Sequence, residues 1–219
     1  MFYVVKCKLR PKKYQSDYFD KNIGCCRFIY NHCLDYCIDH YEKNKDLDKK
    51  DQQKRPSSYD LQKLLPALKR ENVWLAEVDS QALKYAAAQV DPAFKNFFRR
   101  LKTGEAPGFP RYKRKYKSRA SFTLTQGEKI DYRDNAVRLP KIGWVRLDHT
   151  NFNPPNRSDT RVKRCTISRS PSGNYYISML FADDLEEPEE HHSPDNKITA
   201  LDIGLKLSLI HISEPTRPY

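Results

Sequence analysis

The hydrophobic and polar positions near the start of the chain follow two periods, one typical of a strand and one of a helix. Residues 2–9 alternate apolar and basic side chains, which predicts a short strand that ends at Pro11. An apolar stripe with helical spacing follows, and it predicts one long amphipathic helix. The members of this stripe are Cys26, Ile29, Tyr30, Cys33, Leu34, Cys37, Ile38 and Tyr41.

The next stretch is polar first and then apolar. Residues 43–57 are highly charged and end in a Pro-Ser-Ser sequence, so we expect a loop. Leucines spaced through residues 61–68 then predict a short helix. Pro66 interrupts this helix, because proline lacks the N–H and clashes with the preceding turn.

A second apolar stripe covers residues 80–102, but Pro92 lies inside it. Proline is costly in a helix interior and tolerated in the first turn, where Asp91 would be the N-cap. The segment is therefore either one kinked helix or two abutting helices. The stripe consists of Leu83, Ala86, Ala87, Val90, Phe94, Phe97, Phe98 and Leu101.

After Gly104 the pattern changes to short alternating runs. Residues 121–182 are rich in Thr, Val, Ile, Tyr and Arg, which predicts strands. Residues 161–168 and 175–181 flank the turn sequence Pro171-Ser172-Gly173-Asn174. This arrangement predicts a β-hairpin.

The C-terminal part places an acid where a metal could be held. Residues 183–195 contain seven Asp or Glu and predict a solvated linker. Residues 197–204 then predict a strand with Asp202 at its end. Such a carboxylate can hold a divalent metal when other carboxylates converge on it. An Asp that simply begins a turn is the alternative.

Composition adds a strong positive charge to this picture. The 219 residues contain 40 Lys or Arg and 28 Asp or Glu, a net charge of +12. This balance excludes acidic, mucin-like and collagen-like classes and favours a polyanionic partner, most commonly nucleic acid. No apolar run has the length of a transmembrane helix, and the N-terminus lacks a signal core. We therefore expect a cytoplasmic protein that does not bind membranes.

The six cysteines show neither a C-x-x-C pair nor a His partner at zinc-ligand spacing. Three of them belong to the first helical stripe. We expect reduced, buried thiols at Cys7, Cys25, Cys26, Cys33, Cys37 and Cys165.

The strongest chemical signal is a basic run with interleaved aromatic residues. Between Lys95 and Arg119 the chain carries ten Lys or Arg and a single acid, Glu105. Cations follow a phosphate backbone and aromatic faces stack on bases, so the run favours nucleic-acid binding over a solvated charged face. Phe97 and Phe98 are assigned to packing first, which leaves tyrosines as the stacking candidates. The candidate nucleic-acid-binding residues are Lys95, Arg99, Arg100, Lys102, Arg111, Tyr112, Lys113, Arg114, Lys115, Tyr116, Lys117 and Arg119.

Six segments, taken together and in this order, resemble the TnpB (OrfB-type) proteins of bacterial insertion sequences. They are RFIYN (27–31), AFKNFFRR (93–100), GFPRYK (108–113), LPKIGWV (139–145), ISRSPSGNYY (167–176) and LDIGLK (201–206). The last segment resembles the first RuvC motif of that family. Pro92 departs from the residue usual in the family, which leaves the local helix geometry open.

The resemblance implies an RNA-guided DNA endonuclease, in a family also classed as transposases and related to type V CRISPR effectors. Base pairing with the guide reads the sequence there, while the protein holds the heteroduplex in a basic channel. The implied partners are guide RNA and target DNA. The implied cofactor is Mg²⁺, with Asp202 as the first catalytic carboxylate of an RNase H-like nuclease.

The fold implied by the resemblance is α+β, with a helical recognition lobe inserted into a β-barrel wedge domain and followed by the first strand of a RuvC domain. The expected parts are the first wedge strand (1–10), a helical lobe with a helix-turn-helix (11–118), the wedge β-barrel (119–182), the acidic linker (183–196), the start of the RuvC-like domain (197–206) and a foreign tail (207–219).

The end of the sequence departs from the family. Complete members continue with two further catalytic acids and a four-cysteine zinc element, which this sequence does not contain. Residues 207–217 resemble an in-frame translation of a tagmentation sequencing adapter, so we expect the natural protein to be longer. The expectation is a fragment that binds nucleic acid but does not cleave it alone. The alternatives are a non-catalytic DNA-binding regulator with helix-turn-helix-like N-terminal helices, and a scaffold that its positive charge merely solubilises.

Overall fold

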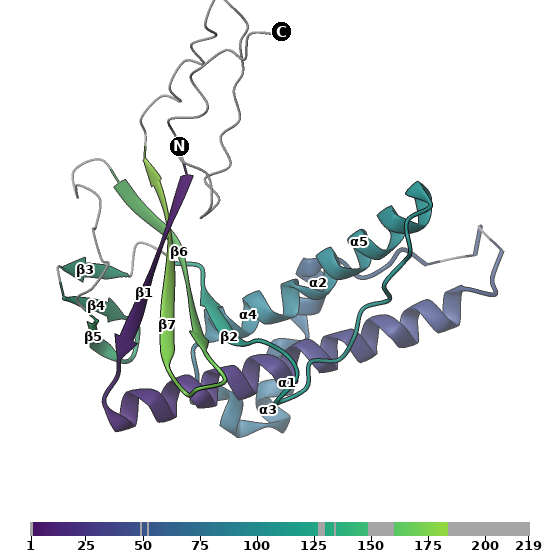
Figure 1. The fold of residues 1–219 in the computed structure, drawn as a ribbon. Coiled ribbons are helices and arrows are strands. Elements are labelled where there is room, and N and C mark those ends of the chain that lie inside the picture. Colours follow the sequence, from purple (N-terminus) through teal and green to yellow (C-terminus); the bar gives the residue numbers. More distant parts are fainter. Residues whose placement is uncertain are drawn as a thin grey trace, which may run out of the picture. The chain divides into compact units, whose positions relative to one another are not determined.

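The computed structural model describes residues 2–48, 50–51, 53–126, 130–133, 135–148 and 160–183. All of them lie in one compact unit, Met1–Leu185. The predicted acidic linker after Asp183, the predicted last strand with Asp202, and residues 207–219 lie outside the described residues. In chain order the elements are β1 (Phe2–Arg10), α1 (Lys13–Asn44), α2 (Ser58–Lys63), α3 (Leu65–Glu71), the 3-10 helix η1 (Val73–Ala76), α4 (Ser80–Ala88), α5 (Val90–Thr103), β2 (Ala120–Leu124), β3 (Asp131–Arg133), β4 (Ala136–Leu139), β5 (Gly143–Leu147), β6 (Thr160–Arg169) and β7 (Tyr175–Asp183) (Figure 1).

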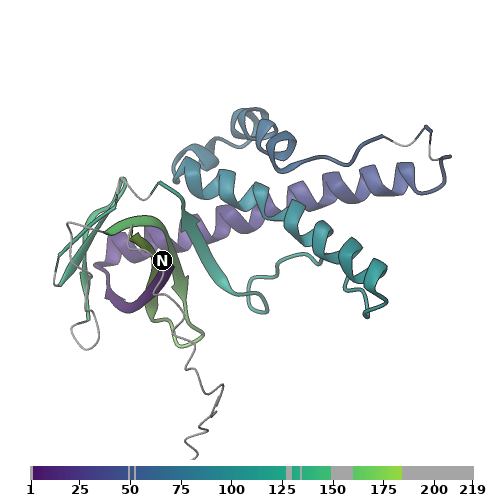
Figure 2. The ribbon, with the colours of Figure 1, turned by 90° about the horizontal axis from the view of Figure 1, so that it is seen from above.

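The strands form one antiparallel sheet in the order β2-β6-β7-β1-β5-β4-β3. The first strand, β1, joins the two halves of the sheet. It pairs with β7 from Phe2 to Leu9, but with β5 only at Leu9 and Arg10. The sheet curves strongly (Figure 2). Among the described strands, β2 and β3 lie at the two edges and do not pair with each other. The sheet is therefore not closed into the predicted barrel. The α and β mixture itself is confirmed.

The predicted hairpin is confirmed as β6 and β7. Nine residue pairs join the two strands, from Thr160↔Asp183 to Arg169↔Tyr175. The turn between them is closed by the Gly173 N–H, which donates to the Ser170 carbonyl at 2.9 Å. Gly173 has a φ of 82°, a left-handed conformation that suits a residue without a Cβ. The hairpin places its turn beside the N-terminal half of α1.

The long first helix is confirmed and is longer than its stripe, at 32 residues. The stripe from Cys26 to Cys37 is buried, because it faces both the other helices and the sheet. Nearer the start of the helix, Phe19 is buried with its ring centroid 6.0 Å from that of Phe122 and 5.5 Å from that of Tyr175. One end of α1 therefore packs on the sheet, while α4 and α5 pack against it further along the helix (Figures 1 and 2).

Two abutting helices, α4 and α5, replace the possible kinked helix. Pro92 is the third residue of α5, where the backbone has no intrahelical acceptor for the missing N–H. Gln89 precedes the helix as its cap, so the prediction of Asp91 as the N-cap was wrong. Asp91 lies in the first turn and is buried instead. The stripe on these helices is buried as far as Phe97, whereas Leu101 is exposed.

The buried apolar residues of the helices and of the sheet form one core. All six cysteines are buried free thiols, as predicted. In the part of the chain that is described, no group of three or more His, Cys, Asp or Glu is placed to hold a metal ion. Nor does any described helix combine the length and apolar character needed to cross a bilayer.

Candidate nucleic-acid interface

The first half of the connection between α5 and β2 is fixed to α1. The Asn31 side chain donates to the Lys113 carbonyl at 3.0 Å and accepts the Lys113 N–H at 2.8 Å. The Lys113 ammonium lies 3.9 Å from the centroid of the Tyr30 ring, a cation–π contact. Burial lowers the pKa of Lys113. This lysine, predicted to bind nucleic acid, is half-buried and used in packing.

Phe109 fixes the same connection to α5. Its ring centroid lies 5.1 Å from that of Phe97, 5.7 Å from that of Phe94 and 6.1 Å from that of Tyr41. The assignment of Phe97 to packing is confirmed by its burial. The segment 108–113 therefore contacts both the segment 93–100, which is close to it in the sequence, and the segment 27–31, which is far from it.

Beyond Lys113 the chain leaves this anchor and borders a groove. A short turn is closed at 3.0 Å by the Ser118 N–H, which donates to the Arg114 carbonyl. The groove has a volume of about 750 Å³ and lies between α1, residues 115–120 and the β6–β7 turn. The Tyr116 side chain is 88% exposed at its wall. The cationic residues that line the groove are Arg27, Lys115, Lys117, Arg119 and Arg169.

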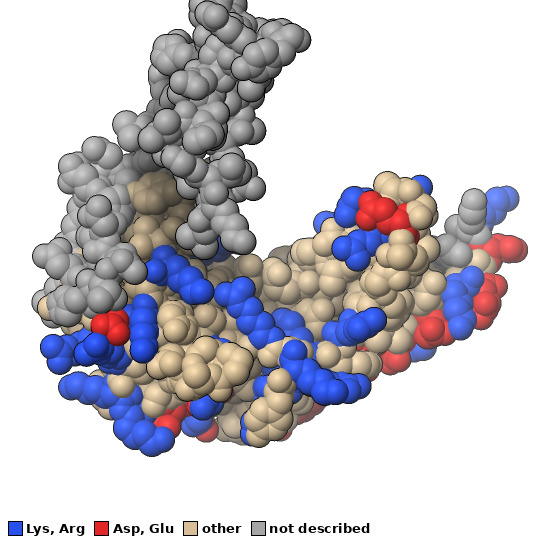
Figure 3. Space-filling view, viewed as in Figure 1, with Lys and Arg blue, Asp and Glu red and all other residues tan. Residues whose placement is uncertain are grey.

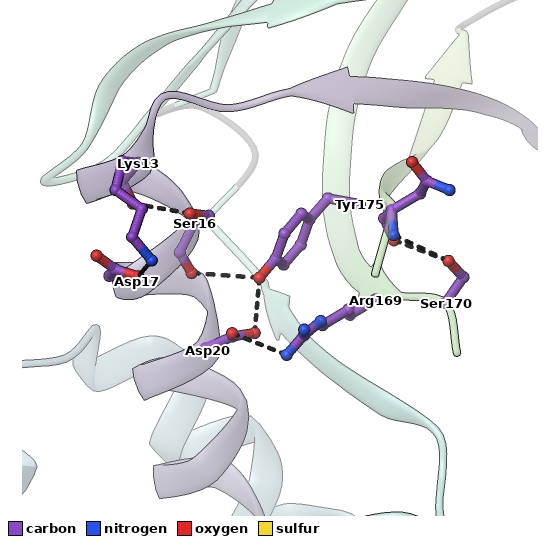
Figure 4. A network of polar contacts seen from close by, with 8 residues as sticks. Lys13, Ser16, Asp17, Asp20, Arg169, Ser170 and Tyr175 are labelled. Carbon is purple, nitrogen blue, oxygen red and sulfur yellow. Dashed lines mark hydrogen bonds and ion pairs between the residues drawn. The ribbon is translucent and has the colours of Figure 1, made fainter. Parts of the chain in front are cut away.

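One wall of the groove is set by a polar network around Asp20 (Figure 4). The Tyr175 hydroxyl donates to Asp20 Oδ1 at 2.7 Å, and Arg169 Nη1 donates to Asp20 Oδ2 at 2.9 Å. Burial, and then the hydrogen bond to Asp20, raise the pKa of Tyr175. The network ties the β6–β7 hairpin to α1, and it satisfies Asp20, the one acid among the groove's lining residues. Arg169 keeps further guanidinium donors for a ligand.

Three of the four predicted cations of α5 are paired with acids of the protein. Lys95 contacts Asp91 at 2.9 Å, and Glu105 lies 3.4 Å from Arg99 and 3.8 Å from Arg100. Glu105 was treated as a lone acid in a basic run, and it neutralises part of that run. Lys102, at the end of α5, is exposed.

The remaining predicted residues divide between the groove and the surface outside it. Lys115, Tyr116, Lys117 and Arg119 line the groove, whereas Arg111 and Arg114 are exposed outside its lining. The Tyr112 hydroxyl donates to Asp35, and this hydrogen bond raises the pKa of Tyr112. Of the two stacking candidates, only Tyr116 therefore stands in the groove.

Two groove residues, Arg27 and Arg169, were not among the predicted site residues. Each is an isolated cation outside the basic run, and only tertiary packing brings it to residues 115–119. The signal that could have found them is their place in the segments 27–31 and 167–176.

Figure 3 shows Lys and Arg gathered on the face of the molecule that carries the β6–β7 hairpin and the connection from α5 to β2, with few acids among them.

A family model described as a helix-turn-helix domain, of the OrfB IS605 type, matches residues 2–46. In the structure the matched residues hold β1 and the single uninterrupted helix α1.

Two curated relatives match most of this chain. One, from Escherichia coli (strain K12), is named "Putative RNA-guided DNA endonuclease InsQ" and is 28% identical over 202 residues, which is 91% of this chain. The other, from Streptomyces pristinaespiralis, is named "Putative RNA-guided DNA endonuclease" and is 27% identical over 180 residues, which is 81% of this chain. The chain spans less than half of these relatives, 44% and 41% of their lengths.

Proposed function

We propose that this chain, for which the comparisons confirm the resemblance to TnpB (OrfB-type) proteins, forms part of an RNA-guided DNA endonuclease and holds its nucleic acid. The observation that carries the proposal is the groove of about 750 Å³, which five cations and the exposed Tyr116 line. Cations at such a groove attract a phosphate backbone, and an exposed aromatic face can stack on a base. The names of the two relatives support guide RNA and target DNA as the ligands.

The arrangement around the groove suits backbone recognition rather than base reading. Its cations come from α1, from residues 115–119 and from the β6–β7 turn, so they surround the groove from three elements. Charges spread in this way neutralise phosphates whatever the base sequence. A protein whose guide reads the sequence by base pairing needs this kind of surface.

The regulator alternative has less support from the geometry. It requires two helices joined by a turn, with the second helix placed in the major groove of a DNA duplex. The residues that the helix-turn-helix model matches contain one continuous helix, Lys13–Asn44, whose central stripe is buried. A binding preference for one DNA sequence, without RNA, would nevertheless restore this alternative.

Binding of the full chain to three probes of one sequence tests the proposal. The probes are an RNA–DNA heteroduplex of about 20 base pairs, a DNA duplex and a single-stranded RNA. We expect the heteroduplex to bind at least as tightly as the DNA duplex. With about four phosphate contacts, log K should fall against log salt concentration with a slope of about −3 to −4. Salt-independent or absent binding, or sequence-dependent binding to the DNA duplex alone, would contradict the proposal.

The nuclease part of the function depends on residues outside the described ones. The assignment of Asp202 as a Mg²⁺ ligand remains a proposal, and none of the steps above depends on it. One carboxylate cannot assemble a site that needs several. We therefore expect no Mg²⁺-dependent cleavage by this chain alone. An assay of the purified chain on target DNA with guide RNA tests this, and detectable cleavage would contradict the expectation.

A further inference from the structure

We infer that Lys69, Lys84 and Lys141 form a second phosphate-binding cluster, which contacts the phosphodiester backbone of the nucleic acid outside the groove. The inference rests on the proposed function, because it names a further contact of the same ligand. None of the three lysines lines the groove, and none belongs to the basic run between α5 and β2.

The three lysines come from three different elements and meet around one short segment. Lys69 is in α3, and its ammonium donates to the Ser80 hydroxyl at 2.8 Å. Lys141 is in the turn between β4 and β5, and its ammonium donates to the Val78 carbonyl at 2.8 Å. Lys84 follows Ser80 by four residues on α4, so the two lie on the same face of that helix. The segment from residue 78 to residue 84 thus gathers three positive charges.

The charges are close enough to affect one another. Burial lowers the pKa of Lys69, the like charges of Lys141 and Lys84 lower it further, and the charge of Asp79 acts in the opposite direction. Gathering like charges costs free energy, and a bound polyanion would remove this cost. Each ammonium has three donors, and the protein hydrogen bonds given above use one each on Lys69 and Lys141.

Two acids, Asp79 within the segment 78–84 and Glu77 next to it, are already engaged. Asp79 is buried, and its Oδ1 accepts the N–H groups of Gln81 at 2.7 Å and Ala82 at 3.2 Å. Glu77 forms an ion pair with Lys21. These carboxylates therefore cap α4 and bind α1, and they leave Lys84 and Lys141 exposed with their charge.

Lys141 is also held in an unusual backbone conformation. Its φ of 64° makes it the one non-glycine residue with positive φ among the described residues. This conformation is costly for a lysine and persists only where the surroundings enforce it. The bond to the Val78 carbonyl is one such constraint, and it holds the ammonium beside α4.

The double variant Lys84→Gln with Lys141→Gln tests the cluster. Both side chains are exposed. The thermal midpoint of the variant is measured as well, because Lys141→Gln removes the ammonium that donates to the Val78 carbonyl. The control is Lys50→Gln with Lys54→Gln, which removes two exposed charges from the loop after α1. With the labelled heteroduplex as probe and about 0.1 M salt, we expect the cluster variant to bind about ten-fold more weakly or worse. Its salt slope should be shallower by about 2, and the control should change little.

Equal losses in the cluster variant and the control would overturn the inference, since they would show a general effect of net charge. If the cluster variant binds like the wild type while substitutions in the groove abolish binding, the inference fails and the proposed function stands. If the wild type does not bind the heteroduplex, both fail. Displacement of the heteroduplex by millimolar inorganic phosphate at matched ionic strength, lost in the cluster variant, would assign a small-anion site and overturn the phosphodiester assignment.

Discussion

The cations of α5 and those of residues 115–119 belong to one basic run in the sequence, yet they differ in their ion pairing in the folded protein. Lys95, Arg99 and Arg100 find Asp91 or Glu105 within 4 Å. The described structure gives no ion pair to Lys115, Lys117 or Arg119, which line the groove instead. The comparison shows that the density of charge along a sequence overstates a binding surface, because some of the cations pair with acids in the folded protein.

The largest loss of stability is expected at Asp91, the buried acid that pairs with Lys95 in α5. The Asp91 side chain is only 6% exposed and contacts Arg55 at 2.5 Å, Lys95 at 2.9 Å and Ser58 at 3.0 Å. Asp91→Ala leaves the half-buried Arg55 without its partner, so the free energy of unfolding should fall by about 3 kcal/mol. Chemical denaturation measures this change. A loss below about 0.5 kcal/mol would show that the cluster does not stabilise the fold.

The contribution of Asp91 should also depend on pH. Burial acts to raise its pKa, but hydrogen bonds from Lys95, Arg55 and Ser58 outweigh burial and lower it. A lowered folded-state pKa gives stability that is present above the unfolded value of about 3.9 and is lost as the pH falls through the folded value. The stability difference between wild type and Asp91→Ala should therefore shrink below about pH 4. A constant difference in denaturation curves down to acid pH would contradict this assignment.

A smaller loss of stability is expected at the anchor between the two regions. Asn31→Ala removes two hydrogen bonds to the Lys113 backbone. Leaving these part-buried backbone groups without partners should cost about 2 kcal/mol. Because residues 114–119 follow this anchor directly, heteroduplex affinity should fall as well. Asn31→Asp keeps the acceptor and loses the donor, so it should lie between wild type and Asn31→Ala in thermal unfolding.

The smallest effect is expected at the exposed aromatic residue of the groove. Tyr116→Ala should leave stability unchanged, since its side chain is 88% exposed. Loss of one stacking contact should weaken single-stranded RNA binding about ten-fold. Tyr112→Ala is the matched control, because Tyr112 lies outside the groove and its hydroxyl is bonded to Asp35. Equal losses in a binding titration would remove the distinction between the two tyrosines.

The sequence predicted much of the local structure and only part of the site. Helical spacing from Cys26 to Cys37 and the turn residues before Tyr175 are local signals, so α1 and the β6–β7 hairpin could be read directly. The partners of the site residues are not local. Asn31 meets Lys113 across 82 positions, and Arg55 meets Asp91 across 36. Alternation of apolar and polar residues does not reveal such pairs.

The same limit explains the groove and the sheet. Arg27 and Arg169 are single cations that tertiary packing brings beside residues 115–119, and the bonds of Arg169 and Tyr175 to Asp20 hold the hairpin there. The barrel was implied by resemblance, and pattern alone does not decide whether a curved sheet closes at its edges. The pairing of β1 with β5 over only two residues is a register detail that no periodicity contains.

Two triple variants with the same loss of charge test the central claim most directly. One is Lys115→Gln with Lys117→Gln and Arg119→Gln in the groove, and the other is Lys95→Gln with Arg99→Gln and Arg100→Gln in α5. Heteroduplex binding across a salt series should be about 100-fold weaker for the groove variant at about 0.1 M salt, with a slope shallower by about 2 to 3. The α5 variant should lose several-fold less affinity than the groove variant. Its free energy of unfolding should fall by more than that of the groove variant. Equal affinity losses, or a larger loss in the α5 variant, would contradict the claim that folding consumes the α5 cations and leaves those of the groove for nucleic acid.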